Sequence, residues 1–325
     1  MQREVTAKKK LRLFSGRSHP ELAEEIASTL DVPLGDANLR NFANGEIHCR
    51  YAENIRGTDV FIIQTHCHPV NDAIMEQFIM IDAAKRASAK RVTAVCPLYG
   101  YARQDRKAEG REPISAKLVA DLFEAAGADR IVSIDLHSGQ IQGFFSGPVD
   151  HLTAMPVLLE YLNREAPDDL VVVSPDAGRV KVGARFSQHL NADLAFVHKR
   201  HLRGVADAVE AHDVIGDVDG RHCVIIDDRI DTGGTIVAAS EILMAKGATE
   251  VWAMATHGLL ADPATDRLKN APIARLVVTN TVPIPTEKQL DNLEVLSVAK
   301  IFADGIDAVF GDASVSEIFG GENQS

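Results

Sequence analysis

A short segment in the second half of the chain carries the residue types most suited to chemistry. It reads Asp227-Asp228-Arg229-Ile230-Asp231-Thr232-Gly233-Gly234-Thr235, and it joins an apolar run to a helical pattern. The two glycines would let the backbone approach a phosphate closely, and the first N–H groups of the following helix carry partial positive charge. The threonine hydroxyls add donors. This combination predicts a phosphate-binding loop.

Asp227 and Asp228 open the segment, although carboxylates would repel a phosphate. Paired carboxylates instead suit the 2,3-diol of a ribose, because ionised carboxylates accept the hydrogen bonds that hydroxyls donate. We therefore interpret the segment as a site for a sugar phosphate. The simpler alternative is an acidic turn with an ordinary Asp or Thr helix cap. The chain lacks the pattern G-x-x-x-x-G-K-[ST], so any ATP would be held without a Walker P-loop.

Composition limits the class of protein. The chain has 325 residues, 46% of them hydrophobic, which is sufficient for two domains with full cores. Its net charge of −12 argues against a nucleic-acid partner, because such partners need clustered Lys and Arg. The four cysteines form no Cys-x-x-Cys pair, and no apolar run has the length of a membrane span. We therefore expect a cytoplasmic protein without a membrane partner.

Short apolar runs alternate with amphipathic segments along the chain, which is typical of a parallel α/β sheet. We predict strands at residues 59–64, 91–96, 130–135, 170–174, 222–227, 251–255 and 275–279. In open α/β sheets, ligands bind beyond the carboxyl ends of the strands. Candidate site residues at or near such ends are Asp135, His137, Asp176, Asp227 and His257.

An internal similarity indicates two domains of similar topology. Residues 125–132 and 245–252 each read as a helix end, a glycine turn and a strand, although such helix exits are common enough for coincidence to be the alternative. We expect an α/β fold of two similar domains, each a mainly parallel twisted sheet flanked by helices. The expected domains are 8–153, completed by 312–325, and 154–311.

Residues 97–113 form a long connection between a predicted strand and a predicted helix. The connection is rich in Arg and Lys and contains Gly100 and Gly110 as candidate hinges. We interpret it as a lid over a triphosphate, the alternative being a solvated charged loop. The helix that follows should turn inward a stripe formed by Leu118, Val119, Leu122 and Phe123.

Two further patterns contain chemically versatile side chains. The triplet His66-Cys67-His68 has metal-binding residue types, but adjacent side chains on an extended chain diverge and no fourth ligand is evident, so we interpret it as a loop. Lys199 follows the apolar run Leu194 to Val197 and would project a positive charge from a strand end. A solvated surface lysine is the alternative reading.

Segment 227–235 resembles the binding motif for phosphoribosyl pyrophosphate (PRPP) in the phosphoribosyltransferase superfamily, a motif that several activities share. Two other segments resemble the ribose-phosphate pyrophosphokinase family in particular. They are Arg103 to Lys107, continuing at Arg111 to Lys117, and Asp135 to Phe145. The resemblance extends through residues 14–16, 42–46, 174–178 and 278–281, and so covers nearly the whole chain.

This resemblance implies an enzyme that transfers the diphosphoryl group of Mg-ATP to the C1 hydroxyl of ribose 5-phosphate, giving PRPP and AMP for nucleotide biosynthesis. It implies a catalytic role for Lys199. The implied ATP contacts are Phe42, Asn44, Glu46, Arg103, Gln104, Lys107 and Arg111. The implied sugar-phosphate contacts are Asp227, Asp228, Asp231, Thr232, Gly233, Gly234 and Thr235. The implied magnesium contacts are His137 and Asp176, although magnesium prefers oxygen ligands.

The resemblance also implies regulation and assembly. Members of the family act as hexamers that inorganic phosphate activates and ADP inhibits. The residues matching the allosteric phosphate contacts are Arg56, Ser314 and Ser316. Asn54 replaces a family serine at this site, which weakens the expectation of phosphate dependence.

Two departures from the family pattern affect the expected active site. His201 stands where the family has an arginine, and a neutral imidazole lacks the guanidinium's paired donors; Arg200 and Arg203 are candidates to compensate. Arg229 stands where the family has an apolar residue, and its charge would pair with Asp228 or Asp231.

Two alternative functions retain part of the pattern. A PRPP-consuming phosphoribosyltransferase would keep segment 227–235 but would not need the ATP segments. A non-catalytic partner of the synthetase would keep the fold, since fold alone does not establish activity. The departures at His201 and Arg229 are the only sequence features that favour this second alternative.

Overall fold

A computed structural model describes residues 9–200 and 211–321 of the chain, without the side chains of residues 199, 200, 211 and 212. The chain divides into two compact units. Unit 1 comprises the described residues of Met1–Thr153 and Ala299–Ser325, and unit 2 those of Ala154–Val298.

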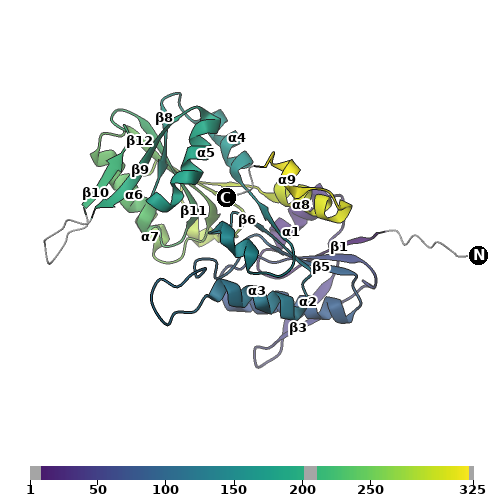
Figure 1. Cartoon of the computed structure of the whole chain (residues 1–325). Coiled ribbons are helices and arrows are strands. Elements are labelled where there is room, and N and C mark those ends of the chain that lie inside the picture. Colours follow the sequence, from purple (N-terminus) through teal and green to yellow (C-terminus); the bar gives the residue numbers. More distant parts are fainter. Residues whose placement is uncertain (1–8, 201–210, 322–325) are drawn as a thin grey trace, which may run out of the picture. The chain divides into compact units, whose positions relative to one another are not determined.

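Unit 1 is built on a parallel sheet with the strand order β1-β4-β5-β6-β7. These strands are β1 (Leu11–Ser15), β4 (Asp59–Ile63), β5 (Arg91–Cys96), β6 (Arg130–Ile134) and β7 (Val149–Leu152). An antiparallel hairpin is added by β2 (Ala37–Asn41) and β3 (Ile47–Tyr51). Helices α1 (Pro20–Thr29) and α8 (Ala299–Gly311) pack together, as do α2 (Val70–Arg86) and α3 (Ser115–Ala126), and the two pairs flank the sheet (Figure 1). Helix α9 (Val315–Ile318) packs on α8.

Unit 2 contains a sheet with the order β10-β9-β8-β11-β12-β13-β14, parallel except for the pairing of β10 with β9. Its strands are β8 (Leu170–Ser174), β9 (Asp193–Arg200), β10 (Ala211–Ile215), β11 (His222–Ile230), β12 (Glu250–Gly258), β13 (Arg275–Thr279) and β14 (Leu293–Leu296). Its helices are α4 (Met155–Glu165), α5 (Val180–Leu190), α6 (Gly234–Ala245) and α7 (Ala264–Lys269). The expected fold class, with a mainly parallel sheet and flanking helices in each unit, is confirmed.

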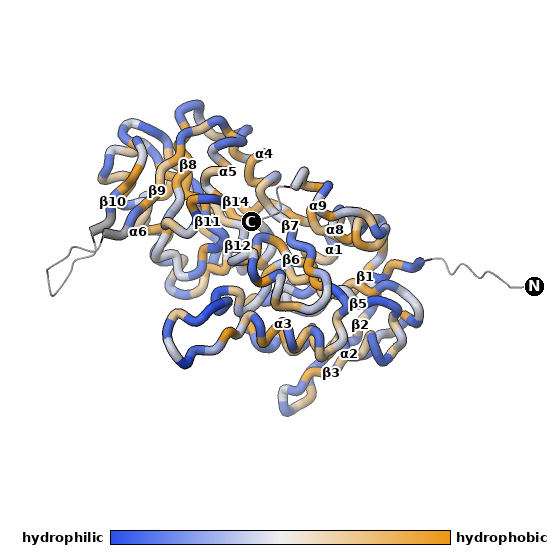
Figure 2. Tube along the Cα trace, in the orientation of Figure 1, coloured by the Kyte–Doolittle hydropathy of each residue, from blue (hydrophilic) through white to orange (hydrophobic). Residues whose placement is uncertain are grey.

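All seven predicted strands are present, as β4, β5, β6, β8, β11, β12 and β13. They read as continuous apolar runs because helices cover both faces of a parallel sheet, so that every residue of β4 and of β8 is buried. Figure 2 shows these sheet segments in the colours of hydrophobic residues. Among the helices of the described ranges, none has the length and apolar character needed to cross a membrane.

The internal similarity corresponds to two equivalent turns. Gly127 ends α3 with a φ of 101°, and Gly247 follows α6 with a φ of 95°. A Cβ at Gly247 would lie 2.0 Å from Asp219 Oδ1, and one at Gly127 would lie 2.7 Å from Lys85 Cγ. Each turn leads into a parallel strand, β6 in unit 1 and β12 in unit 2, as the sequence predicts.

The expected inward stripe of α3 is wrong in part. Val119 and Phe123 are buried, whereas Leu118 and Leu122 are exposed. The helix buries the small residues Ala116 and Ala120 instead, which join Val119 and Phe123 in the hydrophobic core of unit 1.

Residues 299–311 form α8, which packs against α1 and β7 of unit 1. The sequence analysis placed this segment in the second domain and returned the chain to the first only at residue 312. The helix belongs to unit 1 because its apolar face, with Phe302 and Ile306 fully buried, covers the sheet there.

We predict that Gly127→Ala and Gly247→Ala each lower the free energy of unfolding by about 1 kcal/mol or more, because both positions require a positive φ. Gly110→Ala is the control, since a Cβ at Gly110 would meet no atom within 4 Å. Its change should stay within about 0.5 kcal/mol. Urea unfolding of the three variants measures these differences, and equal losses in all three would contradict the prediction.

Candidate functional site

Strand β11 carries the start of the predicted sugar-phosphate segment. The sequence analysis ended this strand at Asp227, but the structure continues it to Ile230 because its pairing with β12 extends to Ile230↔Gly258. Asp227 to Arg229 therefore lie within the sheet rather than in a mobile turn. Ile230 is 1% exposed and anchors the carboxyl end of the strand in the core.

The turn from β11 into α6 has the geometry expected of a phosphate-binding loop. Gly233 precedes the helix with a φ of 75°, and a Cβ there would lie 3.3 Å from Leu268 Cγ, so glycine is required. The N-cap residue of α6 is Gly233, which has no side chain to cap the helix, and Gly234 and Thr235 in the first turn are exposed, as an anion site at a helix start would need. Thr232 and Thr235 are exposed on either side of this turn, and Asp231 is half-buried.

A carboxylate pair and two arginines form an ionic cluster at the end of β11. Arg179 Nη2 lies 2.6 Å from Asp228 Oδ1, and Arg179 Nε lies 3.5 Å from Asp227 Oδ1. Arg229 Nε lies 3.5 Å from Asp228 Oδ2, so the first of the two partners expected for Arg229 is confirmed. The four side chains are between 6% and 15% exposed. The cluster is therefore largely removed from water.

Burial, together with the charge of Asp228, raises the pKa of the Asp227 carboxyl from 3.8 to about 8. The guanidinium of Arg179 acts in the opposite direction, but at 3.5 Å it does not outweigh burial and the like charge. At neutral pH, Asp227 therefore carries a proton in the unliganded site. A protonated Asp227 can donate a hydrogen bond as well as accept one.

Asp176 lies between β8 and α5 and organises the turn that carries Arg179. Its Oδ1 accepts hydrogen bonds from the N–H groups of Gly178 at 2.8 Å and Arg179 at 3.1 Å. The carboxylate is exposed, so its second oxygen faces solvent-accessible space where a cation could bind.

Lys199 lies on β9, paired with His212 in the antiparallel register. Its side chain and that of Arg200 lie outside the described part of the structure, as do residues 201–210, which include His201 and Arg203. The catalytic assignment of Lys199 and the effect of His201 therefore stay predictions.

The three residues implied to contact adenine come together at the tip of the β2–β3 hairpin. Phe42 is 48% exposed, and its ring contacts His48 edge-on at 5.6 Å and Arg40 at 5.7 Å. Glu46 N–H donates to the side chain of Asn44, which stabilises the tight turn. An exposed aromatic ring on a rigid hairpin can stack on a nucleotide base.

The long connection 97–113 is present as a loop between β5 and α3, and its root is anchored. Gln104 Oε1 accepts a hydrogen bond from Ser115 Oγ at the start of α3. Asp105 is buried and accepts hydrogen bonds from Ser138 Oγ at 2.5 Å and Gln140 Nε2 at 2.7 Å. The loop root is thereby joined to the segment that follows β6.

The basic residues of this loop divide between the root and the tip. Arg103 lies at the root, whereas Lys107 and Arg111 lie at the exposed tip, where Arg111 has a φ of 72°. Figure 2 shows the tip in the colours of hydrophilic residues. His137 is half-buried in the segment beside the root. The structure thus groups four predicted ATP or metal contacts within unit 1.

The other histidines singled out in the sequence lie in a buried strand or in a loop. His257 is buried on β12, with Nδ1 2.9 Å from Thr281 Oγ1. The triplet at 66–68 lies in a loop after β4, as predicted. Within residues 9–200 and 211–321, no group of three or more His, Cys, Asp or Glu side chains is arranged to hold a metal ion.

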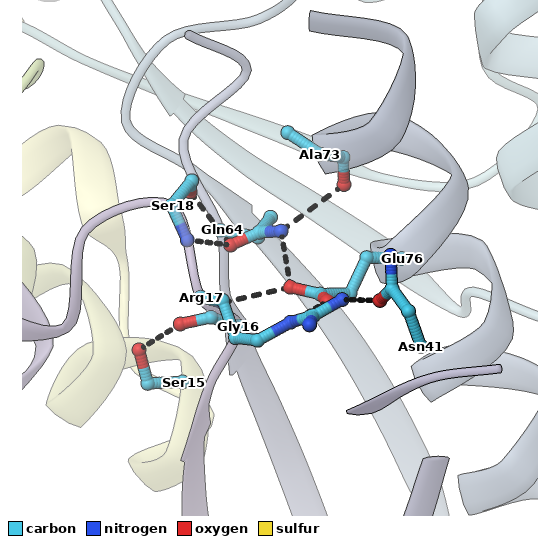
Figure 3. Close-up of polar contacts among 8 residues, drawn as sticks. All are labelled: Ser15, Gly16, Arg17, Ser18, Asn41, Gln64, Ala73 and Glu76. Carbon is cyan, nitrogen blue, oxygen red and sulfur yellow. Dashed lines mark hydrogen bonds and ion pairs between the residues drawn. The ribbon is translucent and has the colours of Figure 1, made fainter. Parts of the chain in front are cut away.

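Unit 1 has a polar network at the carboxyl ends of β1 and β4 (Figure 3). Glu76 is 2% exposed and accepts hydrogen bonds from Arg17 Nε at 2.5 Å, Arg17 N at 2.7 Å and Gln64 Nε2 at 2.9 Å. Arg17 Nη2 also donates to Asn41 Oδ1, at the end of β2 next to the hairpin turn. A cavity of about 320 Å³ lies beside this network. The network fixes the hairpin to the edge of the sheet.

Comparison with known proteins accounts for both units. Residues 11–127 match the N-terminal domain of ribose phosphate pyrophosphokinase, and residues 174–320 match the phosphoribosyl synthetase-associated domain. The chain is 55% identical over 316 residues to ribose-phosphate pyrophosphokinase from Streptomyces avermitilis, covering 97% of this chain and 98% of the relative. The chain belongs to the ribose-phosphate pyrophosphokinase family.

Other members of the ribose-phosphate pyrophosphokinase family are similar over the same length. The enzyme of this name from Clostridium acetobutylicum is 51% identical over 313 residues, covering 96% of this chain and 98% of the relative. The crystal structure of phosphoribosylpyrophosphate synthetase from Mycobacterium smegmatis matches with a TM-score of 0.89 and 51% identity, covering 94% of this chain and all of that one. The two-unit fold is therefore that of the family.

Two residues beside segment 227–235 were missed in the sequence analysis. Arg179 pairs with the buried carboxylates, and Arg267 on α7 donates from Nη1 to the carbonyl of Thr232 at 3.2 Å. Arg179 immediately follows the quoted segment 174–178, and that position was the available signal. Arg267 had no such signal, because only the fold brings α7 beside the loop.

The residues implied to bind allosteric phosphate in the pyrophosphokinase family all lie in unit 1. Arg56 precedes β4, and Ser314 and Ser316 lie at the start of α9. The described side chains form no hydrogen bond between Arg56 and either serine. Asp312, just before α9, pairs with Arg91 at the amino end of β5. The start of α9 therefore lies on the side of the sheet formed by the amino ends of the strands, and Arg56, which precedes β4, lies on the same side.

We predict that Asp227→Asn stabilises the protein more at pH 9 than at pH 6. The folded pKa of about 8 lies above the ordinary 3.8, so the folded state retains a proton that the unfolded state has lost. The free energy of unfolding of the wild type therefore decreases as pH rises between these values, and Asn removes that decrease. Urea unfolding at both pH values measures the difference.

Asp228→Asn is the matched control for this prediction. It removes the charge that pairs with Arg179 Nη2 at 2.6 Å, so it should lower the free energy of unfolding by roughly 1–3 kcal/mol at pH 6. The loss should be smaller at pH 9, because the same charge raises the pKa of Asp227. An Asp227→Asn variant whose stability relative to wild type is the same at pH 6 and pH 9 would contradict the assignment of the raised pKa.

Proposed function

We propose that this chain transfers the diphosphoryl group of ATP to the C1 hydroxyl of ribose 5-phosphate, giving PRPP and AMP. The observation that carries the proposal is the buried carboxylate pair of β11 followed by the turn into helix α6, whose N-cap residue is Gly233. Membership of the pyrophosphokinase family supports it over the full length of the chain.

Ribose 5-phosphate would be held by the turn between β11 and α6. The 5-phosphate would accept hydrogen bonds from the N–H groups of residues 231–235 and from the hydroxyls of Thr232 and Thr235, assisted by the positive end of α6. Asp227 and Asp228 would bind the 2,3-diol. Arg267, beside the carbonyl of Thr232, would add positive charge close to the phosphate.

ATP would be held by the hairpin tip and the long loop. Phe42 would stack on the adenine, and Asn44 and Glu46 would contact its polar edge. Arg103 and Gln104 would contact other parts of ATP from the anchored root, while the exposed Lys107 and Arg111 would close over the phosphates. Such closure excludes water and strengthens charge interactions with the transferred group.

Magnesium fits the chemistry of Asp176, an exposed carboxylate held in place by two backbone N–H groups. Bound there, the ion would neutralise charge on the phosphates of ATP. His137 is a less usual magnesium ligand, so we propose it as a contact to the metal or to ATP itself. Lys199 would stabilise negative charge on the transferred group and on the leaving oxygen of AMP.

The assay that tests this function follows AMP and PRPP by chromatography after incubation with Mg-ATP, inorganic phosphate and ribose 5-phosphate. We expect equimolar products, lost in Lys199→Ala because the transition state loses a fixed positive charge. Lys300→Ala is the control, since Lys300 is exposed on α8 and pairs only with Asp304 among the described residues.

Failure of this assay would separate the alternatives. A folded protein that binds ATP or PRPP but forms neither product would favour a non-catalytic partner of the synthetase. Consumption of PRPP with release of pyrophosphate in the presence of a nucleobase would instead indicate a phosphoribosyltransferase.

We further propose that the protein forms a hexamer, is activated by inorganic phosphate and inhibited by ADP, and works in the cytoplasm. The resemblance to the family supports the assembly and the regulation. The four cysteines have free thiols, which supports a reducing compartment. Arg56, Ser314 and Ser316 would bind the activating phosphate.

We predict that Arg56→Ala removes the increase in activity that phosphate produces, because the variant loses the guanidinium that would pair with the effector. The rate measured without phosphate should remain. Arg86→Ala is the control, because Arg86 is 79% exposed and pairs with Asp82 within the same helix. Activity measured against phosphate concentration decides, and an unchanged dependence in Arg56→Ala would contradict the assignment.

A further inference from the structure

His66 occupies a buried position between strand β4 and the root of the long loop. It is 1% exposed, its ring stacks on Phe123 at 5.9 Å, and Tyr99 lies 6.1 Å away. None of the roles assigned above uses this residue. A buried imidazole that is fully hydrogen-bonded can fix the position of its partners.

The hydrogen bonds around Gln77 determine which nitrogen of His66 carries the proton. Gln77 Nε2 donates to the carbonyls of Ile62 at 3.0 Å and Val95 at 3.3 Å, on the adjacent strands β4 and β5. Its Oε1 must therefore accept, and it lies 2.8 Å from His66 Nε2. His66 thus carries its proton on Nε2, and Nδ1 has a free lone pair.

The free lone pair holds the loop root. Gly100 N–H donates to His66 Nδ1 at 2.8 Å. The backbone of His66 donates to the carbonyl of Leu98, and Leu98 N–H donates to Thr65 Oγ1. The sheet carbonyls, Gln77, His66 and Gly100 therefore form one continuous chain of hydrogen bonds from the sheet into the loop.

Gly100 is packed rather than free to act as a hinge. A Cβ at this position would lie 2.7 Å from Ile74 Cδ1 and 3.1 Å from His66 Cβ. The absence of a side chain lets the backbone approach the imidazole closely enough for the hydrogen bond. The backbone after Gly100 leads within four residues to Arg103 and Gln104.

Protonation of His66 would break this arrangement, because a proton on Nδ1 would face the N–H of Gly100. Burial lowers the pKa of His66 to about 4, so the imidazole is neutral near neutral pH. The ring of Tyr99 lies beside the imidazole, and the thiol of Cys96 contacts Gln77, the partner of His66. Burial raises the pKa of both groups, so both are neutral. The surroundings therefore contribute no charge at neutral pH.

We propose that His66 is a positioning residue for the ATP-binding loop, setting the place of Arg103 and Gln104 through its hydrogen bond to Gly100. The inference rests on the proposed function, because it assigns a catalytic consequence to the loop root. Displacing reacting groups by about 1 Å can reduce a rate roughly 100-fold. Loss of the Gly100 bond should therefore reduce kcat and leave the KM for ribose 5-phosphate less affected, because the proposed site for that substrate lies in unit 2.

Two substitutions of similar polarity separate positioning from simple packing. His66→Asn keeps an acceptor oxygen close to the position of Nδ1, so Gly100 retains its partner. His66→Gln places its terminal amide nearer to the position of Nε2, which can serve Gln77 but leaves Gly100 unpaired. We expect kcat of His66→Gln to fall roughly 10- to 100-fold and that of His66→Asn to stay within roughly 3-fold of wild type.

Hydrogen exchange at the Gly100 amide gives a readout that does not require activity. The amide should be protected in wild type and His66→Asn and exchange faster in His66→Gln. His68→Gln is the control for both measurements, because His68 is exposed in the same loop. Equal kcat and equal exchange in the Asn and Gln variants would overturn the proposal.

The two measurements also distinguish failure of this inference from failure of the proposed function. If wild type forms no PRPP but Gly100 exchange differs between the variants as expected, the enzymatic proposal fails and the structural part of the His66 role stands. If wild type is active and exchange differs while kcat does not, the hydrogen bond exists but the positioning role is wrong.

Discussion

The burial of two adjacent carboxylates within β11 is the constraint on which the sugar-phosphate site depends. Pairing with β12 keeps Asp227 and Asp228 inside the sheet, where an unpaired charge costs several kcal/mol. Arg179 compensates one charge, and a proton compensates the other at neutral pH. A ligand that supplies hydroxyl donors can replace this compensation, and for that reason the pair suits a diol.

The same strand fixes the phosphate loop. Because Ile230 is buried and Gly233 packs against Leu268, the turn has little freedom before α6 begins. The N–H groups at the helix start are therefore directed before any ligand arrives. Preorganised donors lose less entropy on binding than a flexible loop would, which would favour the proposed phosphate binding despite a net charge of −12.

The sequence was sufficient to predict seven of the strands and the two glycine turns, because these depend on local patterns. A strand covered on both faces must be apolar throughout, and a turn with positive φ favours glycine. The pairing of Arg179 with Asp228 was not predictable, since it depends on β8 and β11 being neighbours in the sheet. The buried face of α3 was also missed in part, because alanines rather than the larger leucines lie in the core.

The two units use a similar, mainly parallel sheet in different ways. In unit 1, buried polar side chains at the carboxyl ends of the strands have partners within the fold: Gln64 bonds Glu76, and Gln77 bonds strand carbonyls and His66. In unit 2, the corresponding region exposes the start of α6 and two threonine hydroxyls. A saturated network stabilises geometry, whereas unsatisfied donors bind ligands. The shared fold therefore explains the architecture, and the state of the polar groups at the strand ends explains why one unit would position loops while the other would bind the sugar phosphate.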